Sequence, residues 1–391
     1  MTSPAPAGRS AGDLRLSLAL GVAAFLAAAA LAVARSGHGA PDFDVFWTAA
    51  RHWQAPYDPA PVKALEAQLH LTGTWPFVYP PSFLLILWPF AQLPLSLAYP
   101  LWTGLGAALF MFVASQAVKP TWAAAVLALA PPVFFSAMLG QTTLIMGAAM
   151  LGGWLVIERR PAMAGVLFAA AACIKPQAMI LAPIILWGRW RTFGWMAGAV
   201  VAMLAASLVF GLQRWIEWRH ALTAFAAIAP GADRANPSAL FAGPWWAAAV
   251  AAFGLLFAWR NKNLLGMVGG ALCLTPYAHD YDLAPLAPLA AAWLFQPRTH
   301  GWGHAAAGGA LLAGLLATPA AVLAWLAAVT LLQFRWRPLG QMTNPTRDPS
   351  PDLSPPAAGR GIPAEAVDAA RRTLSIPLPA PVGRGAVRGG R

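Results

Sequence analysis

The sequence predicts an all-α polytopic membrane protein, and both its composition and its apolar patterning support that prediction. Hydrophobic residues make up 59% of the 391 residues and charged residues only 10%, whereas a typical soluble domain has about 25% charged residues. Apolar runs long enough to cross a bilayer recur from Leu14 to Phe334. They are continuous and rich in Ala and Leu, and they lack the alternation of a membrane β-barrel. A soluble enzyme and a nucleic-acid-binding domain are therefore excluded.

The apolar runs define the expected elements. Residues 14–34 form a run longer than the apolar part of a signal peptide, so we expect a retained first helix. The polar segment 35–80 is expected to be an extracytoplasmic first loop. Prolines divide the next stretch into a short interfacial helix near 82–90 and a span over 95–117. The remaining runs are 122–139, 142–157, 162–187 (split at Lys175-Pro176), 193–212, 240–259, 264–274, 283–295, 304–318 and 320–334. Together they predict about 10–13 transmembrane helices.

Basic residues predict the orientation, because cytoplasmic loops are enriched in Lys and Arg. With the N-terminus inside, the basic loops between spans also fall inside, at Lys119, Arg159, Arg160, Arg189, Arg191, Arg260, Lys262, Arg298, Arg335 and Arg337. The segment 35–80, the turns at Gln141 and Lys175, and residues 213–238 and 275–282 fall outside. Three arginines make 213–238 an imperfect fit. We expect a multi-pass protein of the inner cell membrane with both termini cytoplasmic.

The composition changes at Pro338, where Pro, Gly, Ser and Arg replace the apolar runs. We expect a transmembrane domain over residues 1–337 and a disordered, basic cytoplasmic tail over 338–391. The tail arginines suit anionic lipid headgroups. The formal charge of +12 thus reflects loops and tail, and the expected partner is the lipid bilayer, with no nucleic acid. Cys173 and Cys273 show neither a disulfide framework nor zinc-site spacing.

Several polar residues stand at the outer ends of the apolar runs, where burying a charge is costly and a function is therefore expected. Asp42 and Asp44 follow the first helix among aromatic residues. Partial desolvation raises the proton affinity of such a carboxylate, which suits a general base acting on a hydroxyl. The alternative role is a helix-capping aspartate.

Two further motifs provide hydrogen-bonding side chains. Tyr79 precedes Pro80-Pro81 at the start of an apolar stretch. It either lines a pocket or only marks a helix start. Gln141 follows Gly140 in a tight turn between two spans, and its amide suits a hydroxylated ligand. Alternatively, the adjacent threonines cap the next helix.

Lys175-Pro176-Gln177 interrupts an apolar run. A lysine there needs a partner or an anion, and phosphate is an apt one. The alternative is a lysine that snorkels to the interface.

Residues 275–282 form the richest polar cluster, and its candidate ligand-binding residues are Tyr277, His279, Asp280 and Asp282. If the chain turns helical after Pro276, His279 and Asp282 share one face. The cluster suits a phosphate-sugar headgroup. A divalent cation at residues 280–282 stays open, although no metal is required, and an interfacial aromatic belt is the plainer alternative.

Taken in order, these motifs resemble glycosyltransferase family 87 over roughly residues 40–300. The motifs that carry the resemblance are Asp42-Phe43, Phe46-Trp47, Ala49-Ala50, Tyr57-Asp58, Tyr79-Pro80-Pro81, Pro89, Pro94, Gly140-Gln141, Ala164-Gly165, Lys175-Pro176-Gln177, Thr275-Pro276-Tyr277 and Tyr281-Asp282-Leu283.

The resemblance implies a GT-C membrane fold with an extracytoplasmic active site. It implies inverting transfer of a hexose, with mannose favoured, from a polyprenyl phosphate carrier to a lipid or glycan hydroxyl, with no cofactor besides that donor. Asp42 best matches the family's catalytic aspartate, and Asp44 is the near rival. Lys175 and His279 would then stabilise the departing phosphate. The residues expected to bind sugar hydroxyls are Tyr79, Gln141, Gln177, Tyr277 and Asp280.

Two other functions compete with this one. A transporter or a flippase for lipid-linked sugars would also use polar residues in broken helices, although the chain shows no duplicated halves. A non-catalytic scaffold would act through the basic tail.

Overall fold

The computed structural model describes residues 10–35, 41–69, 76–232, 244–275, 279–295 and 308. No strand occurs in these ranges, and the predicted all-α class is confirmed. The α-helices are α1 (Ala11–Arg35), α2 (Pro41–Arg51), α3 (Pro59–Leu69), α4 (Pro81–Ala91), α5 (Leu95–Ala117), α6 (Pro131–Leu139), α7 (Thr143–Val156), α8 (Pro161–Ile174), α9 (Ala182–Ile185), α10 (Trp190–Ser207), α11 (Gln213–Ala232), α12 (Pro244–Arg260), α13 (Leu264–Leu274) and α14 (Ala287–Phe295). Short 3-10 helices are η1 (Thr121–Leu129), η2 (Pro176–Met179), η3 (Leu208–Phe210) and η4 (Asp280–Leu286).

Membrane-spanning helices confirm the predicted polytopic class. Within the described ranges, three helical stretches are long and apolar enough to cross a bilayer, namely Ala11–Arg35, Leu95–Ala117 and Trp190–Phe210. The expected span 122–139 is instead broken into η1 and α6, which meet at an angle of 66°. If this bent pair counts as one span, the described ranges hold four candidate spans. The other apolar runs form helices of 10–17 residues. The higher count of 10–13 spans stays a prediction, and the runs at 304–318 and 320–334 lie outside the described residues.

Two segments that we expected to be loops contain helices. The first polar segment holds α2 and α3, and residues 213–238 hold α11. The end chemistry of α2 explains its helicity, because Asp42 and Asp44 lie in its first turn and Arg51 in its last, where each complements the helix dipole. In α11, Arg214 and Glu217 form an i,i+3 ion pair at 2.7 Å, so charges that suggested a loop instead support a helix.

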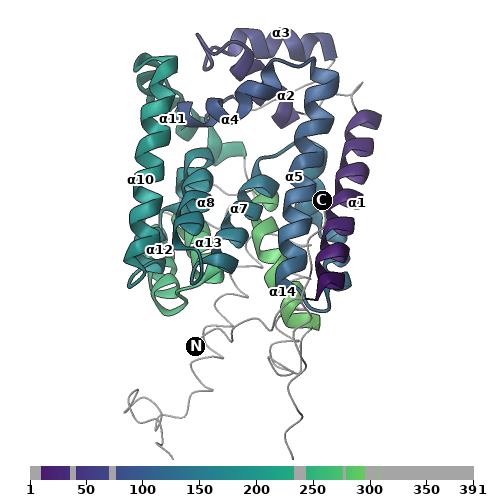
Figure 1. Ribbon diagram of the computed structural model, residues 1–391. Coiled ribbons are helices and arrows are strands. Elements are labelled where there is room, and N and C mark those ends of the chain that lie inside the picture. The colour runs from purple at the N-terminus through teal and green to yellow at the C-terminus, as the bar shows by residue number, and fades with distance from the viewer. Residues whose placement is uncertain are drawn as a thin grey trace, which may run out of the picture. The chain divides into compact units, whose positions relative to one another are not determined.

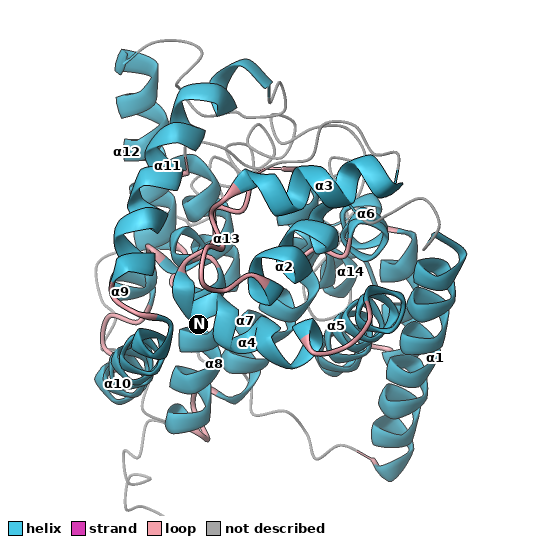
Figure 2. Ribbon diagram, turned by 90° about the horizontal axis from the view of Figure 1, so that it is seen from above, coloured by secondary structure: helices cyan, strands magenta, loops and turns pink. Residues whose placement is uncertain are grey.

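The long helices separate two ends of the helical unit. At one end Lys119 Nζ lies 3.3 Å from Asp13 Oδ1, and Arg189 Nε lies 3.0 Å from Glu158 Oε1. Helices α2, α3, α4 and α11 lie at the other end (Figure 1). Seen from above, α1 and α5 lie on one side of α2, and α10 and α12 lie on the other (Figure 2). The basic loops at Lys119 and Arg189 therefore share one end, while the loops at Arg298, Arg335 and Arg337 lie outside the described residues. The assignment of that end to the cytoplasm stays a prediction.

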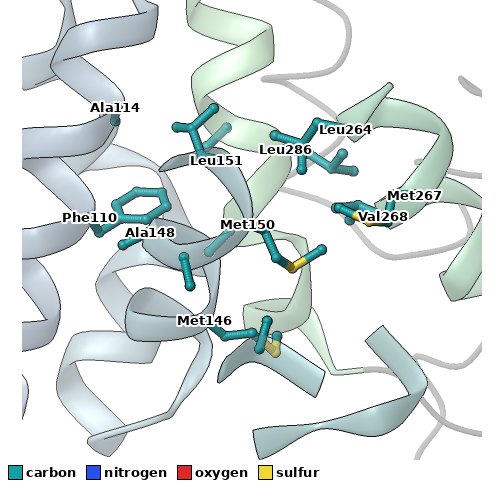
Figure 3. Packing of buried hydrophobic residues seen from close by; sticks show 14 of the residues in the cluster. Phe110, Ala114, Met146, Ala148, Met150, Leu151, Leu264, Met267, Val268 and Leu286 are labelled. Atoms are coloured by element: carbon teal, nitrogen blue, oxygen red, sulfur yellow. The ribbon is translucent and has the colours of Figure 1, made fainter. Parts of the chain in front are cut away.

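Among the described residues, two buried clusters hold the helices together. The larger one joins α5, α7, α13 and η4 through side chains such as Phe110, Met150, Met267 and Leu286 (Figure 3). The smaller one is aromatic and joins α2, α4 and α5. Its buried aromatic members are Phe43, Phe46, Phe77, Phe83, Tyr99, Trp102 and Phe210. This aromatic cluster fixes the position of α2, which carries the predicted catalytic carboxylates.

Candidate active site

A cavity of about 340 Å³ lies between α2, the segment before α4, and α11. Its polar wall is built from segments that are far apart in the chain. The residues of that wall are Asp42, Tyr79, Gln141, Lys175, Gln177, His279 and Tyr281. Asp42, Lys175 and His279 thus line one cavity, which is the convergence that the sequence predicts.

Packing of α2 directs Asp42 toward this cavity. The neighbouring side chains Phe43 and Phe46 are buried, and the indole nitrogen of Trp47 donates to the carbonyl of Leu93 at 3.0 Å. The Arg51 guanidinium donates to the carbonyl of Ala91 at 3.1 Å. These contacts fix α2 on the C-terminal end of α4 and the loop after it. Because its neighbours on α2 pack against α4 and the loop after it, the partly exposed Asp42 borders the cavity.

The environment of Asp42 suits a base. Burial raises the pKa of the Asp42 carboxyl above its ordinary value, while a hydrogen bond from Gln141 and the charges of His279 and Lys175 partly oppose that rise. A carboxylate with a raised pKa accepts a proton more readily than an ordinary exposed aspartate.

Asp44, the rival catalytic residue, does not line the cavity. It is buried with 3% of its surface exposed. Its charge acts on the hydroxyl of Tyr99, to which Arg35 hydrogen bonds. Asp44 thus belongs to the packing between α1, α2 and α5.

The turn between α6 and α7 positions the side chain of Gln141 next to Asp42. Gly140 ends α6 with φ +68°, a backbone conformation that favours glycine. A Cβ atom on Gly140 would lie 2.6 Å from the Cβ of Phe43, so the turn and α2 approach closely. The Trp102 indole donates to the carbonyl of Gly140 at 2.8 Å. Thr142 occupies the N-cap position of α7, but its side chain makes no cap bond.

Gln141 links two groups of the polar wall. Its Oε1 accepts from the backbone N–H of Thr142 at 3.2 Å and from the Tyr79 hydroxyl at 3.4 Å. Its side chain also hydrogen bonds to Asp42. Burial raises the pKa of the Tyr79 hydroxyl, so Tyr79 stays a neutral donor.

Lys175 lies at the break between α8 and η2, as its motif predicts, and it does not snorkel. Only 7% of the residue is exposed, and its Nζ lies 2.6 Å from Asp282 Oδ1. The ammonium also lies 5.2 Å from the ring centroid of Tyr281 and 5.9 Å from that of Tyr79. A carboxylate and two aromatic faces therefore hold the cation at the cavity wall.

His279 and Asp282 cap each other at the start of η4. The backbone N–H of His279 donates to Asp282 Oδ2 at 3.2 Å, and the side chain of His279 accepts from the backbone of Asp282. The His279 ring stacks on Tyr281 with centroids 4.8 Å apart. This reciprocal cap fixes His279 and Tyr281 at the cavity.

The opposite wall is apolar and includes α11. Trp218, Leu222 and Phe225 line it, and their i, i+4, i+7 spacing puts them on one helix face. The Trp218 indole donates to the carbonyl of Val78 at 2.9 Å, which fixes the helix against the extended segment before α4. The sequence motifs predict neither this apolar wall nor the position of Tyr281 at the cavity. The helical spacing of Trp218, Leu222 and Phe225 in the sequence could have indicated the wall.

The other predicted site residues differ in their placement. Gln177 lines the main cavity and also a small one of about 40 Å³ behind Lys175. Asp282 lines only the small cavity. Tyr277 lies outside the described residues, as does the side chain of Asp280, so the cation site considered at residues 280–282 stays untested.

Comparison with known proteins identifies a family. The family model of glycosyltransferase family 87 matches residues 77–278. Tyr79, Gln141, Lys175 and Gln177 lie inside that range, whereas Asp42 and His279 lie outside it. Neither the curated proteins nor the solved structures gave a match.

The Gly140 turn yields a stability prediction. Gly140→Ala lowers the apparent unfolding temperature in detergent more than Gly188→Ala does. Both glycines have positive φ, at 68° and 86°, so both variants incur the left-handed backbone penalty of about 1–2 kcal/mol. Only the Cβ at position 140 collides with Phe43, since nothing lies within 4 Å of one at Gly188. Equal losses would show that α2 does not depend on this close approach.

The Lys175–Asp282 pair yields a second prediction. Lys175→Met leaves the carboxylate of Asp282, whose side chain is only 15% exposed, without its counter-charge and destabilises the protein by about 3–5 kcal/mol. Adding Asp282→Asn removes that charge and restores part of the unfolding temperature. Glu158→Gln, which breaks the exposed pair with Arg189, serves as the control and costs less than about 1 kcal/mol. A double variant less stable than Lys175→Met alone would contradict the ion pair.

Proposed function

Because the chain belongs to glycosyltransferase family 87 and is therefore a membrane glycosyltransferase, we propose that it transfers a hexose from a polyprenyl phosphate carrier to a lipid or glycan hydroxyl. Mannose is the first sugar to test. The observation that carries the proposal is that one cavity is lined by a carboxylate with a raised pKa, Asp42, and by the cation Lys175. These are the two groups that a displacement at an anomeric carbon requires.

The proposed reaction is a single displacement. Asp42 accepts the proton of the acceptor hydroxyl as that oxygen attacks the anomeric carbon. The bond from the anomeric carbon to the phosphate oxygen breaks, and the polyprenyl phosphate leaves with the electron pair. Lys175 and His279 stabilise the charge that develops on the departing phosphate. One displacement inverts the anomeric centre, and it needs no cofactor beyond the donor.

The remaining polar wall positions the sugar. Tyr79 and Gln141 present a hydroxyl and an amide beside Asp42, and Gln177 borders the same cavity. We propose that these groups bind sugar hydroxyls, together with Tyr277 and Asp280 from the adjoining segment. The apolar wall of Trp218, Leu222 and Phe225 suits the first isoprene units of the carrier.

Aromatic clusters at the two ends of the helices support a site near a membrane surface. Trp53 and Trp88 pack against each other with ring centroids 6.2 Å apart at the cavity end. At the basic end, Trp187 and Trp190 pack at 5.2 Å, close to Trp259. Tryptophan is enriched at membrane–water interfaces, and basic residues at the cytoplasmic one. We therefore propose that the cavity faces the extracytoplasmic side of the inner membrane, with the N-terminus and the tail cytoplasmic.

A transporter or flippase is the second candidate, and it would require a path that opens to both membrane faces. The apolar side chains of α7 and α13, among them Met146 and Leu272, wall the small cavity behind Lys175. This packing supports a site that works from one face.

The general base yields a direct test. Asp42→Asn lowers transfer of mannose from polyprenyl-phosphate mannose by at least about 100-fold, because proton transfer by a positioned side chain contributes about 10²–10⁴-fold. Asp58→Asn is the matched control, since Asp58 is exposed and caps α3 by accepting from the N–H of Ala60 at 2.9 Å, a role that Asn can fill. Transfer by Asp42→Asn at the wild-type rate would refute the assigned base.

The pH dependence gives a further test. Only ionised Asp42 accepts a proton, so kcat/KM falls as the pH drops through the pKa of Asp42. That acid limb lies above the ordinary aspartate value because burial raises the pKa. Gln141→Leu removes the hydrogen bond that lowers it, so the limb moves to higher pH. Gln92→Leu, which replaces an exposed amide on the loop after α4, leaves the limb in place. An unmoved limb in Gln141→Leu would argue against Asp42 as the titrating base.

A further inference from the structure

Asp282 stands apart from the other predicted substrate-binding residues. Lys175 borders both the main cavity and the small one behind it, whereas Asp282 borders only the small one. Asp282 therefore lies behind Lys175 as seen from the main cavity. The sugar and the phosphate of a donor in the main cavity would meet Lys175 first.

The two carboxylate oxygens of Asp282 hold different parts of the polar wall. Oδ1 lies 2.6 Å from Lys175 Nζ and 3.4 Å from the Thr143 hydroxyl. Oδ2 accepts from the backbone N–H of His279 at 3.2 Å. One side chain on η4 thus connects the break after α8, the start of α7 and the turn that carries His279.

We propose that Asp282 is a positioning residue of the transfer reaction, which fixes Lys175 and His279 toward the departing phosphate without touching substrate. This inference rests on the proposed function, because it assigns Lys175 and His279 to that phosphate. It replaces the substrate-binding role that the sequence suggests for Asp282.

Two physical effects support the positioning role. A lysine side chain has many rotamers, and ordering it costs conformational entropy, so a short ion pair keeps the ammonium at the wall before substrate arrives. A buried ammonium is also costly without a counter-charge, and the carboxylate of Asp282 supplies one at 2.6 Å. The carboxylate of Asp282 therefore holds the Lys175 ammonium in position before the donor binds. Such preorganised charge stabilises the charge that develops in a transition state.

Charge also argues against direct binding by Asp282. An anionic donor phosphate and a carboxylate repel each other, and Lys175 lies between Asp282 and the main cavity. The carboxylate thus acts on the phosphate through the two residues that it holds, Lys175 and His279.

A double-mutant cycle on the full-length protein in detergent tests the role, with polyprenyl-phosphate mannose as the donor. Asp282→Asn lowers kcat/KM by at least tenfold in the wild-type background, with most of the loss in kcat. In the Lys175→Met background the same substitution lowers kcat/KM by less than threefold, because Lys175 is gone and the oxygen of the introduced amide can still accept from the His279 N–H. Equal fold-losses in the two backgrounds, or wild-type kcat/KM in Asp282→Asn, would overturn the positioning role.

Controls separate positioning from folding and from failure of the proposed function. Glu217→Gln removes the carboxylate of another ion pair, the one with Arg214, and its effect is the same in both Lys175 backgrounds. If Asp282→Asn does not fold, Asp282→Glu replaces it, because it keeps the charge and shifts the carboxylate by one methylene. Its loss of kcat/KM is smaller and again depends on the presence of Lys175. A wild-type protein that transfers no mannose or other hexose overturns the proposed function, whereas additive losses in an active protein overturn only the role of Asp282.

Discussion

The burial of charge next to an apolar helix bundle constrains the rest of this structure. Lys175 interrupts a run of apolar residues, and an uncompensated ammonium there would be costly. Asp282 compensates it at 2.6 Å, and that pairing brings η4 to the break between α8 and η2. The N-terminal end of η4 carries His279 and Tyr281. One ion pair thus brings two distant segments of the chain to the same cavity wall.

The other half of the cavity depends on aromatic packing. Phe43 approaches the Gly140 turn so closely that a Cβ atom there would collide with it. That contact puts Asp42 beside Gln141. The base and the cation are therefore held by independent means, one by packing of α2 and the other by an ion pair. Asp42 and Lys175 therefore line the same cavity, and the counter-charge of Lys175 is Asp282 rather than Asp42.

The sequence predicted features with strong local chemistry. Residues 95–117 were predicted as a span and form α5 with those bounds. The break at Lys175-Pro176 follows from proline and a buried charge, and the turn at Gly140 from a glycine between apolar runs. Helices α2 and α11 were missed, because their charged residues suggest loops when amphipathic spacing is not weighed. The choice between Asp42 and Asp44, and the side of Lys175 on which Asp282 lies, depend on tertiary packing that no local pattern encodes.

In the proposed reaction, Asp42 and Lys175 face the same lipid-linked sugar phosphate. An experimental structure of the full-length protein with a bound polyprenyl monophosphate tests it most directly. We expect the phosphate within hydrogen-bond distance of Lys175 Nζ in the main cavity, the first isoprene units against Trp218 and Phe225, and Asp42 across the space left for the sugar. A phosphate bound at the basic end of the helices, or in the main cavity but away from Lys175, would contradict it.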